Sequence, residues 1–223
     1  MAAEPEQRPL GMVIPSVAAG VEIPPEPPDV SARALSIGSR LLCGATTFFF
    51  VAFVFAYFYL RSLNQDHMWR PGHIHPDQAW GVVFIVCLAA SVLTTILAGR
   101  LLKRRARGWL GLGSAGLVLG LAAVAAQCLE YTVQDFGPTN GAYASVFCVW
   151  TGFYLVAVLG TMYWLETDLA TELRARREPA GSEGDVQDPD RLIAPGVDAA
   201  VFYWSFLGAI GLLTYVVLYL LQA

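Results

Sequence analysis

Five long runs of apolar residues contain no charged residue, no histidine and no proline, and they constrain the fold more than any other feature of the sequence. A helix needs about 20 apolar residues to cross a bilayer, because the hydrocarbon core is about 30 Å thick and each residue rises about 1.5 Å. We therefore predict five transmembrane helices, over residues 41–60, 79–99, 108–129, 142–165 and 199–221.

The composition excludes the other broad classes of protein. Of the 223 residues, 56% are hydrophobic and 14% are charged, whereas soluble domains carry about 25% charged residues. Such high hydrophobicity also excludes disorder of the whole chain, and a net charge of -4 gives no sign of a nucleic-acid partner. The predicted fold is an all-α integral membrane bundle over residues 36–223, preceded by a proline-rich tail over residues 1–35.

The basic residues predict the orientation of this bundle. Most of them lie in the tail, in the loop after the second run and in the loop after the fourth run. Cytoplasmic loops of membrane proteins carry an excess of Lys and Arg. We therefore expect the N-terminus in the cytoplasm, the C-terminus outside, and a flexible cytoplasmic loop over residues 166–198. Residues 1–30 lack the apolar region of a cleavable signal peptide, so we expect the first run to direct insertion.

The residues that usually hold metals are poorly placed for a membrane-embedded centre. Haem and copper within a helical bundle are usually bound by His or Met side chains of the helices. The four cysteines lie inside the predicted helices, where we expect them to pack, and the three histidines follow the first helix: Cys43, Cys87, Cys128, Cys148, His67, His73 and His75. The sequence therefore predicts no catalytic, cofactor-binding or metal site in this chain.

A glycine-rich stretch, Gly111-Leu-Gly113-Ser-Ala-Gly116, matches the dinucleotide-binding pattern as a string. That pattern has to follow a strand and open a helix, whereas this stretch lies within an apolar run. Gly116 and Gly120 have the spacing at which small residues let two membrane helices approach closely. We expect this stretch to serve helix packing.

Glu130 is the ionisable residue that most suggests a site. It follows the third apolar run, with Gln127 one turn before it and Tyr131 beside it. A carboxylate at membrane depth is costly and indicates a function, but Glu130 lies near the end of the run. Two interpretations therefore stay open: a polar contact between helices that involves Gln127 and Glu130, or an interfacial carboxylate that reaches the headgroups.

Four stretches, in order and at matching spacing, resemble subunit III of the haem-copper (cytochrome c) oxidases in its five-helix bacterial form. They are residues 48–61, which end in Arg61, then Gln127-Cys-Leu-Glu130-Tyr131, Thr151-Gly152-Phe153 and Tyr203-Trp204-Ser205-Phe206. The resemblance covers roughly residue 36 to the C-terminus. It implies a multi-pass protein of the bacterial plasma membrane.

The sequence departs from this family at five ionisable positions within the helices. The family's first Glu falls at Thr46, its two His after Thr-Gly-Phe fall at Tyr154 and Ala157, and the His and Asp of its last helix fall at Ser205 and Gly208. In the family, the first Glu and the His positions are associated with a lipid-filled cleft and with support of proton uptake. The resemblance therefore implies that the packing skeleton is kept and that those roles do not carry over.

The resemblance implies a non-catalytic accessory subunit that binds subunit I, the other oxidase subunits and phospholipid, with haem and copper held by the catalytic partner. Two alternatives stay open: an accessory subunit of a nitric-oxide reductase or an oxidase assembly factor with the same fold, and a small channel or transporter. The channel or transporter is disfavoured, because transporters usually carry intramembrane charges and broken helices, whereas these runs contain no charged residue and no proline.

Overall fold

The computed structural model describes residues 28–64, 69–72, 74–106, 108–177 and 189–221. Its elements are α2 (Pro28–Ser62), α3 (Gln78–Lys103), α4 (Trp109–Val133), α5 (Ala142–Arg177), α6 (Pro189–Tyr215) and the π-helix η1 (Val216–Leu220). Within the described residues, five helices are long and apolar enough to cross a membrane. The predicted all-α bundle is therefore confirmed, and its orientation stays a prediction.

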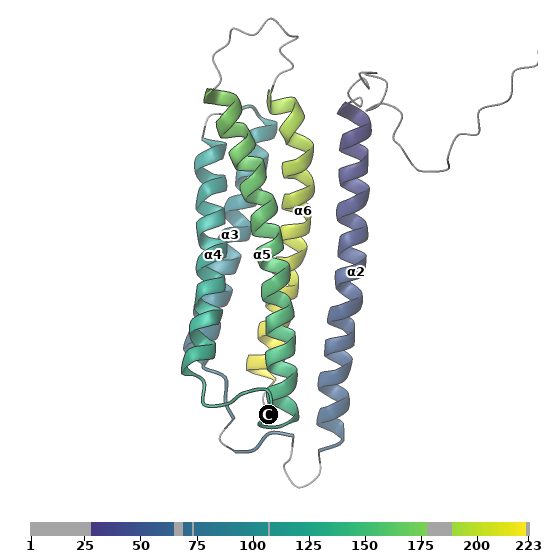
Figure 1. The fold of residues 1–223 in the computed structure, drawn as a ribbon, viewed down its shortest axis with the longest axis vertical. Helices are drawn as coiled ribbons and strands as arrows, with labels where there is room; N and C mark the ends of the chain where they lie inside the picture. The colour runs from purple at the N-terminus through teal and green to yellow at the C-terminus, as the bar shows by residue number, and fades with distance from the viewer. Residues whose placement is uncertain (1–27, 65–68, 73, 107, 178–188, 222–223) are drawn as a thin grey trace, which may run out of the picture.

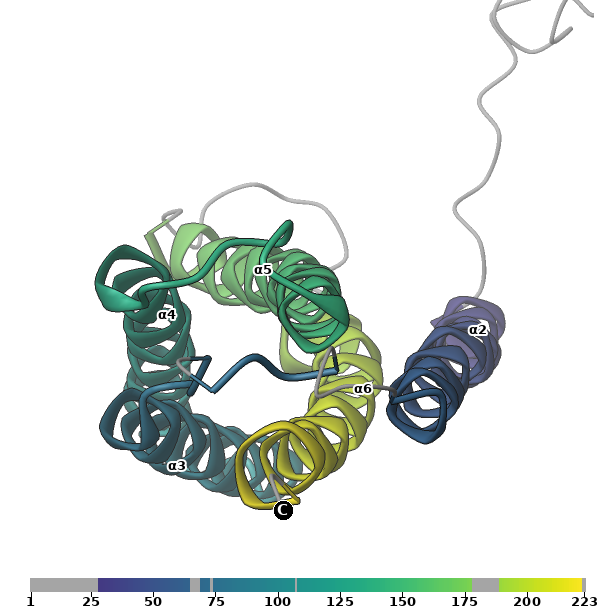
Figure 2. The ribbon, with the colours of Figure 1, turned by 90° about the horizontal axis from the view of Figure 1, so that it is seen from below.

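Four of the helices form a ring and the fifth stands outside it. Viewed along the bundle, α3, α4, α5 and α6 surround a common interior, and α2 lies beside α6 (Figures 1 and 2). Residues 69–72 and 74–77, which lie between α2 and α3 in the chain, cross one end of this ring (Figure 2). We call that lower end in Figure 1 the Glu130 end, and the opposite end the Arg40 end.

Three helices extend beyond the predicted spans at the Arg40 end. α2 begins at Pro28, α5 continues to Arg177 and α6 begins at Pro189. Much of the loop expected over residues 166–198 is therefore helical, while residues 1–27 and 178–188 lie outside the described residues. The apolar runs mark only the part of a helix that hydrocarbon covers, and Leu, Glu, Arg and Ala continue a helix well in water.

The helix ends show local causes. The side chain of Asp77 accepts a hydrogen bond of 2.8 Å from the backbone N–H of Ala79 and so caps α3. Gly108 precedes α4 with a φ of 103°, which glycine adopts without steric cost. Pro195 lies inside α6, within the stretch that we expected to be a flexible loop. It lies in an early turn of α6, before the predicted apolar span.

Glycines bring α3 and α4 together, as their spacing predicts. A Cβ atom on Gly116 would meet Thr95 Oγ1 of α3, and one on Gly120 would meet Met162 Sδ of α5 and lie 3.2 Å from Ser91 Oγ of α3. The hydroxyl of Ser91 on α3 donates a hydrogen bond of 2.5 Å to the carbonyl of Gly116. The close approach of α3 and α4 therefore requires glycine at position 116, and Gly120 makes room for α5 as well as α3.

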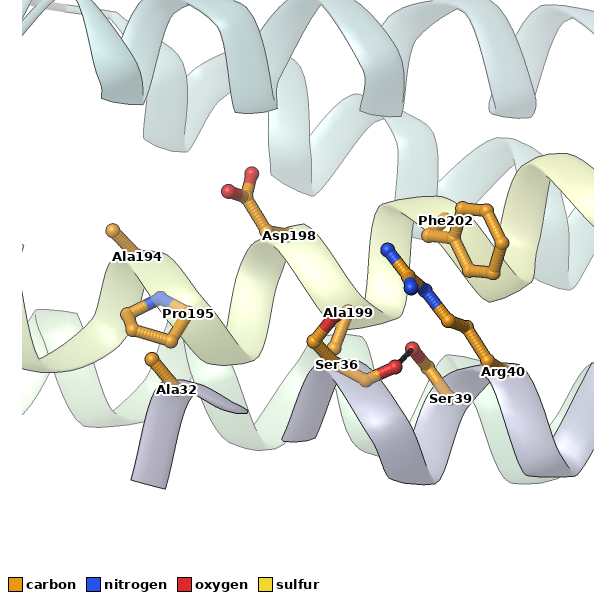
Figure 3. Close-up of a pocket in the computed structure, with 9 residues that line it drawn as sticks. All are labelled: Ala32, Ser36, Ser39, Arg40, Ala194, Pro195, Asp198, Ala199 and Phe202. Atoms are coloured by element: carbon orange, nitrogen blue, oxygen red, sulfur yellow. Dashed lines mark hydrogen bonds between the residues drawn. The ribbon is translucent and has the colours of Figure 1, made fainter. Parts of the chain in front are cut away.

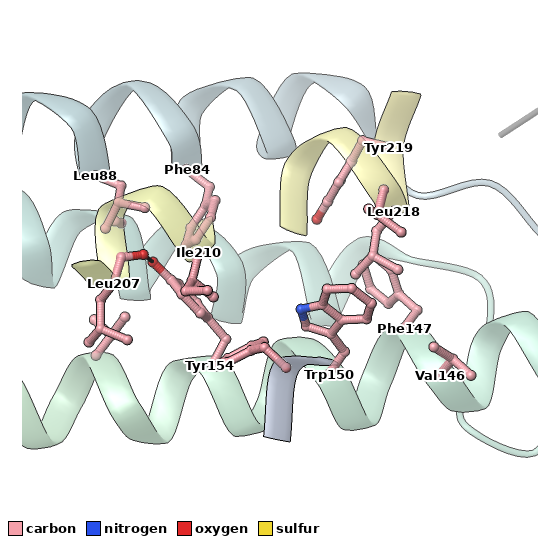
Figure 4. Packing of buried hydrophobic residues seen from close by; sticks show 14 of the residues in the cluster. Phe84, Leu88, Val146, Phe147, Trp150, Tyr154, Leu207, Ile210, Leu218 and Tyr219 are labelled. Atoms are coloured by element: carbon pink, nitrogen blue, oxygen red, sulfur yellow. Dashed lines mark hydrogen bonds between the residues drawn. The ribbon is translucent and has the colours of Figure 1, made fainter. Parts of the chain in front are cut away.

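Aromatic side chains join α2 and α6 to α5. The ring of Phe50 on α2 lies 6.2 Å from Trp150 and 5.9 Å from Tyr154, centroid to centroid, and all three side chains are buried. The indole N–H of Trp150 donates a hydrogen bond of 2.8 Å to Thr214 Oγ1 on α6. Figure 4 shows this core from close by, with side chains of α3, α5, α6 and η1 facing one another.

Candidate functional site

Glu130 is buried completely inside the ring, one turn before the end of α4. Its Oε2 atom accepts two hydrogen bonds, one of 2.7 Å from Gln127 Nε2 and one of 2.5 Å from the hydroxyl of Tyr219. Its Oε1 atom has no hydrogen-bond partner among the described residues. The carboxylate does not reach the surface of the bundle, so the structure favours the polar-contact interpretation over the interfacial one.

Tyr219 is the member of this cluster that the sequence did not single out. Gln127 and Glu130 belong to the same helix, so the contact between helices comes from Tyr219 of η1. The ring of Tyr219 lies against α3, where a Cβ atom on Gly81 would come within 2.6 Å of it. On its other side, Phe147 of α5 lies 5.7 Å away between centroids. In the sequence, the only indication of this contact is that Tyr219 lies near the end of the fifth apolar run, at a membrane depth similar to that of Glu130.

Tyr131 and Thr151 form a second link between helices. The two hydroxyl oxygens lie 2.5 Å apart. The hydroxyl of Thr151 donates to the carbonyl of Phe147 at 2.6 Å, so Tyr131 is the donor to Thr151. This link joins α4 to α5 beside the Glu130 cluster.

The remaining residues predicted from the resemblance serve different contacts. Phe153 packs on α2, with its ring 5.7 Å from Phe50 between centroids. Gly152 has open space where a Cβ atom would lie. The guanidinium of Arg61 donates a hydrogen bond of 2.9 Å to the carbonyl of Leu221. The structure therefore places these residues in helix packing. Among the predicted residues it brings Gln127 into contact with Glu130, and Tyr131 into contact with Thr151.

Neutral hydrogen bonds occupy two of the positions at which the resemblance led us to expect ionisable residues. The hydroxyl oxygens of Thr46 and Tyr203 lie 2.9 Å apart and join α2 to α6. The hydroxyl of Tyr154 donates to the carbonyl of Leu207 at 2.8 Å, which joins α5 to α6 (Figure 4). Each of these bonds connects two helices without placing a charge in the bundle.

The other three of these positions carry small residues. The hydroxyl of Ser205 donates at 2.7 Å to the carbonyl of Val201 in its own helix. Ala157 packs half-buried against the core. A Cβ atom on Gly208 would come within 2.8 Å of Val92 Cγ2. The helices at Gly208 are therefore too close for the family's larger side chain.

The metal-binding residue types do not gather in the part of the chain that the structure describes. No group of three or more His, Cys, Asp or Glu side chains could hold a metal ion there. His75 is exposed, and its Nδ1 lies 2.7 Å from a guanidinium nitrogen of Arg70. His67 and His73 lie outside the described residues.

A cavity of about 480 Å³ lies between α2 and α6 at the Arg40 end. Small and apolar residues of both helices line it, together with Ser36, Ser39, Arg40 and Asp198. In Figure 3 the guanidinium of Arg40 reaches from α2 toward α6, whereas the carboxylate of Asp198 points away from α2. Asp198 forms an ion pair with Lys103 at 3.0 Å. The cavity therefore combines an apolar wall with a cation and two hydroxyls.

The family model for cytochrome c oxidase subunit III matches residues 28–223. The chain belongs to the cytochrome c oxidase subunit III family. This match includes all five membrane-spanning helices, the Glu130 cluster and the cavity at the Arg40 end.

Similar proteins carry the same family name. The chain is 26% identical over 198 residues to cytochrome c oxidase subunit 3 of Pylaiella littoralis, which aligns 84% of this chain with 66% of that one. It is 26% and 27% identical to the subunits 3 of Cyprinus carpio and Latimeria chalumnae, over 69% of their lengths. The chain thus spans about two thirds of the length of these relatives. The subunit III family carries no metal centre, and this member is a multi-pass membrane protein.

Proposed function

We propose that this chain is a non-catalytic accessory subunit of a respiratory haem-copper terminal oxidase. In this role it binds subunit I in the plasma membrane and stabilises the complex that passes electrons to oxygen. The match of the subunit III family to residues 28–223 carries the proposal. The described interior supports it, because hydrogen-bonding groups there join helices to one another and form no metal-binding group.

Purification of the intact complex tests this function. A tag on the N-terminal tail keeps the affinity handle away from the Glu130 end, and a mild detergent keeps the subunits together. We expect haem a or haem o and copper to purify in fixed ratio with the chain, with an oxidase spectrum. Non-haem iron without copper would identify a nitric-oxide reductase instead. Recovery of the chain alone, with solute flux into liposomes, would favour a channel.

We extend the proposal to a bound phospholipid in the cavity between α2 and α6. Arg40 has no carboxylate partner among the described residues, because Asp198 is paired with Lys103. Its guanidinium and the hydroxyl of Ser36 suit a phosphate oxygen, and the apolar wall suits the first carbons of an acyl chain. Native mass spectrometry should show that Arg40→Gln loses bound anionic lipid while the complex keeps its haem. Unchanged lipid content would contradict this assignment of the cavity.

A further inference from the structure

The segment that follows α6 receives hydrogen bonds from side chains of three other helices. Residues 216–221 begin as the π-helix η1 and end with Leu221. Their backbone carbonyls accept bonds of 2.7 to 2.9 Å from Tyr57 and Arg61 on α2, Gln78 on α3 and Tyr143 on α5. The final carbonyls of a helix have no partner within that helix. These donors therefore pair with carbonyls that have no partner within the segment itself.

The Tyr219 side chain connects the segment to the remaining helix, α4. Its hydroxyl donates to Glu130 on α4, and its ring fills the space between Gly81 on α3 and Phe147 on α5. This bond also stabilises Glu130, because without the Tyr219 donor its fully buried carboxylate would keep only the hydrogen bond from Gln127. One short segment is thus in contact with α2, α3, α4 and α5 at the same end of the bundle.

α2 depends on this segment more than the ring helices do. It stands outside the ring and contacts the rest of the bundle along one side only (Figure 2). Side-chain hydrogen bonds of Thr46, Tyr57 and Arg61 connect α2 with other parts of the described chain. One joins Thr46 to Tyr203 near the middle of α2, and the other two, from Tyr57 and Arg61, both end on the carbonyl of Leu221.

We propose that residues 216–221 form a locking segment that fixes α2 against the ring, and that Glu130 is the receptor that selects its position. The chain is synthesised from its N-terminus, so Tyr57, Gln78, Glu130 and Tyr143 all enter the membrane before their partners in the locking segment. Until the segment docks, the α2–α6 bundle holds a buried carboxylate that lacks its tyrosine donor. Docking satisfies this carboxylate and forms the four hydrogen bonds to backbone carbonyls together, so docking of the segment is a distinct step in closing the bundle.

A substitution at Glu130 in two backgrounds tests the receptor role. In the full chain, Glu130→Leu leaves the Tyr219 hydroxyl unpaired. It should lower the ratio of folded to unfolded chain about three-fold, which corresponds to the average free energy of one interhelical hydrogen bond in a membrane. In a chain that ends after Tyr215, the same substitution removes a carboxylate that has no tyrosine donor. It should therefore raise the amount of folded chain recovered in mild detergent. An effect of the same sign in both backgrounds would overturn the receptor role.

Hydrogen–deuterium exchange of the full chain tests the lock on α2 and does not require the shortened chain to fold. Tyr57→Phe removes one donor to Leu221, and we expect faster exchange in the last turns of α2 and in residues 216–221, with α3 and α4 unchanged. Tyr59→Phe is the matched control, because Tyr59 lies on the same helix with its ring half exposed. Equal exchange in the two variants would overturn the proposal.

Discussion

Gly116 shows how a single residue sets the distance between two helices. Its Cα faces α3 so closely that a Cβ atom would overlap Thr95 Oγ1 and lie 3.3 Å from the carbonyl of Ser91. Without a hydrophobic force between helices in lipid, close packing of this kind and hydrogen bonds provide most of the association. The contact at the Gly116 backbone therefore stabilises the packing of α3 on α4, although glycine has no side chain.

Replacing this glycine should destabilise the bundle. Gly116→Ala should cost about 1–3 kcal/mol of stability, because the added methyl group forces α3 and α4 apart. Gly111→Ala on the same helix, where nothing lies within 4 Å of a Cβ atom, should change stability by less than about 0.5 kcal/mol. Unfolding of the purified complex in a denaturing detergent measures both, and equal losses would contradict this account.

Gly208, where the resemblance led us to expect an Asp, also gives a prediction at the residue scale. Gly208→Asp should prevent stable folding, because the side chain meets Val92 and carries a charge that costs about 2.5–3.5 kcal/mol at the centre of a membrane helix. Gly208→Ala separates the two causes, since it adds only the steric part. Immunoblots of the membrane fraction should show a much larger loss for Asp than for Ala, and equal levels would exclude the charge as the cause.

At the scale of the element, α2 has two different faces. Phe50 packs within the aromatic core beside Trp150 and Tyr154, whereas Phe55 is 68% exposed and contacts only its own helix neighbour Tyr59 among the described ring pairs. We expect lipid or a partner subunit to cover the exposed face of α2.

These faces should respond differently to truncation. Phe50→Ala leaves a cavity between α2 and α5 and should cost about 3–5 kcal/mol, the usual range for a buried Phe. Phe55→Ala should leave the stability of the chain itself nearly unchanged. Thermal unfolding of the detergent-solubilised protein measures both losses. A Phe55→Ala variant that is as unstable as Phe50→Ala would mean that α2 packs through its other face.

The elements also show what the sequence could and could not predict. Charge-free runs located all five spanning helices, because a membrane tolerates few charged residues in hydrocarbon. They did not locate the helix ends at Pro28, Arg177 and Pro189, which extend beyond the apolar runs. The Gln127 and Glu130 pairing follows from helix periodicity. Tyr219 did not, because its contact with Glu130 joins segments 89 residues apart.

At the scale of the whole molecule, the orientation of the bundle remains a prediction from the basic residues. Arg104 lies at the Arg40 end and Asn140 at the Glu130 end, and both are exposed. In intact cells, a membrane-impermeant maleimide should label Asn140→Cys and not Arg104→Cys, with the parent chain as control for the native cysteines. Labelling of Arg104→Cys alone would reverse the orientation.

The length of α5 has a practical consequence. Its 36 residues form one continuous helix, about 54 Å long at 1.5 Å per residue, so its polar end extends well beyond a hydrocarbon core of about 30 Å. The polar end of α5 therefore extends into water as a continuation of the same helix. A small soluble domain joined to the last turn of α5 through an uninterrupted helix would move as one body with the bundle, and it would provide the particle asymmetry that image alignment of a small membrane protein needs.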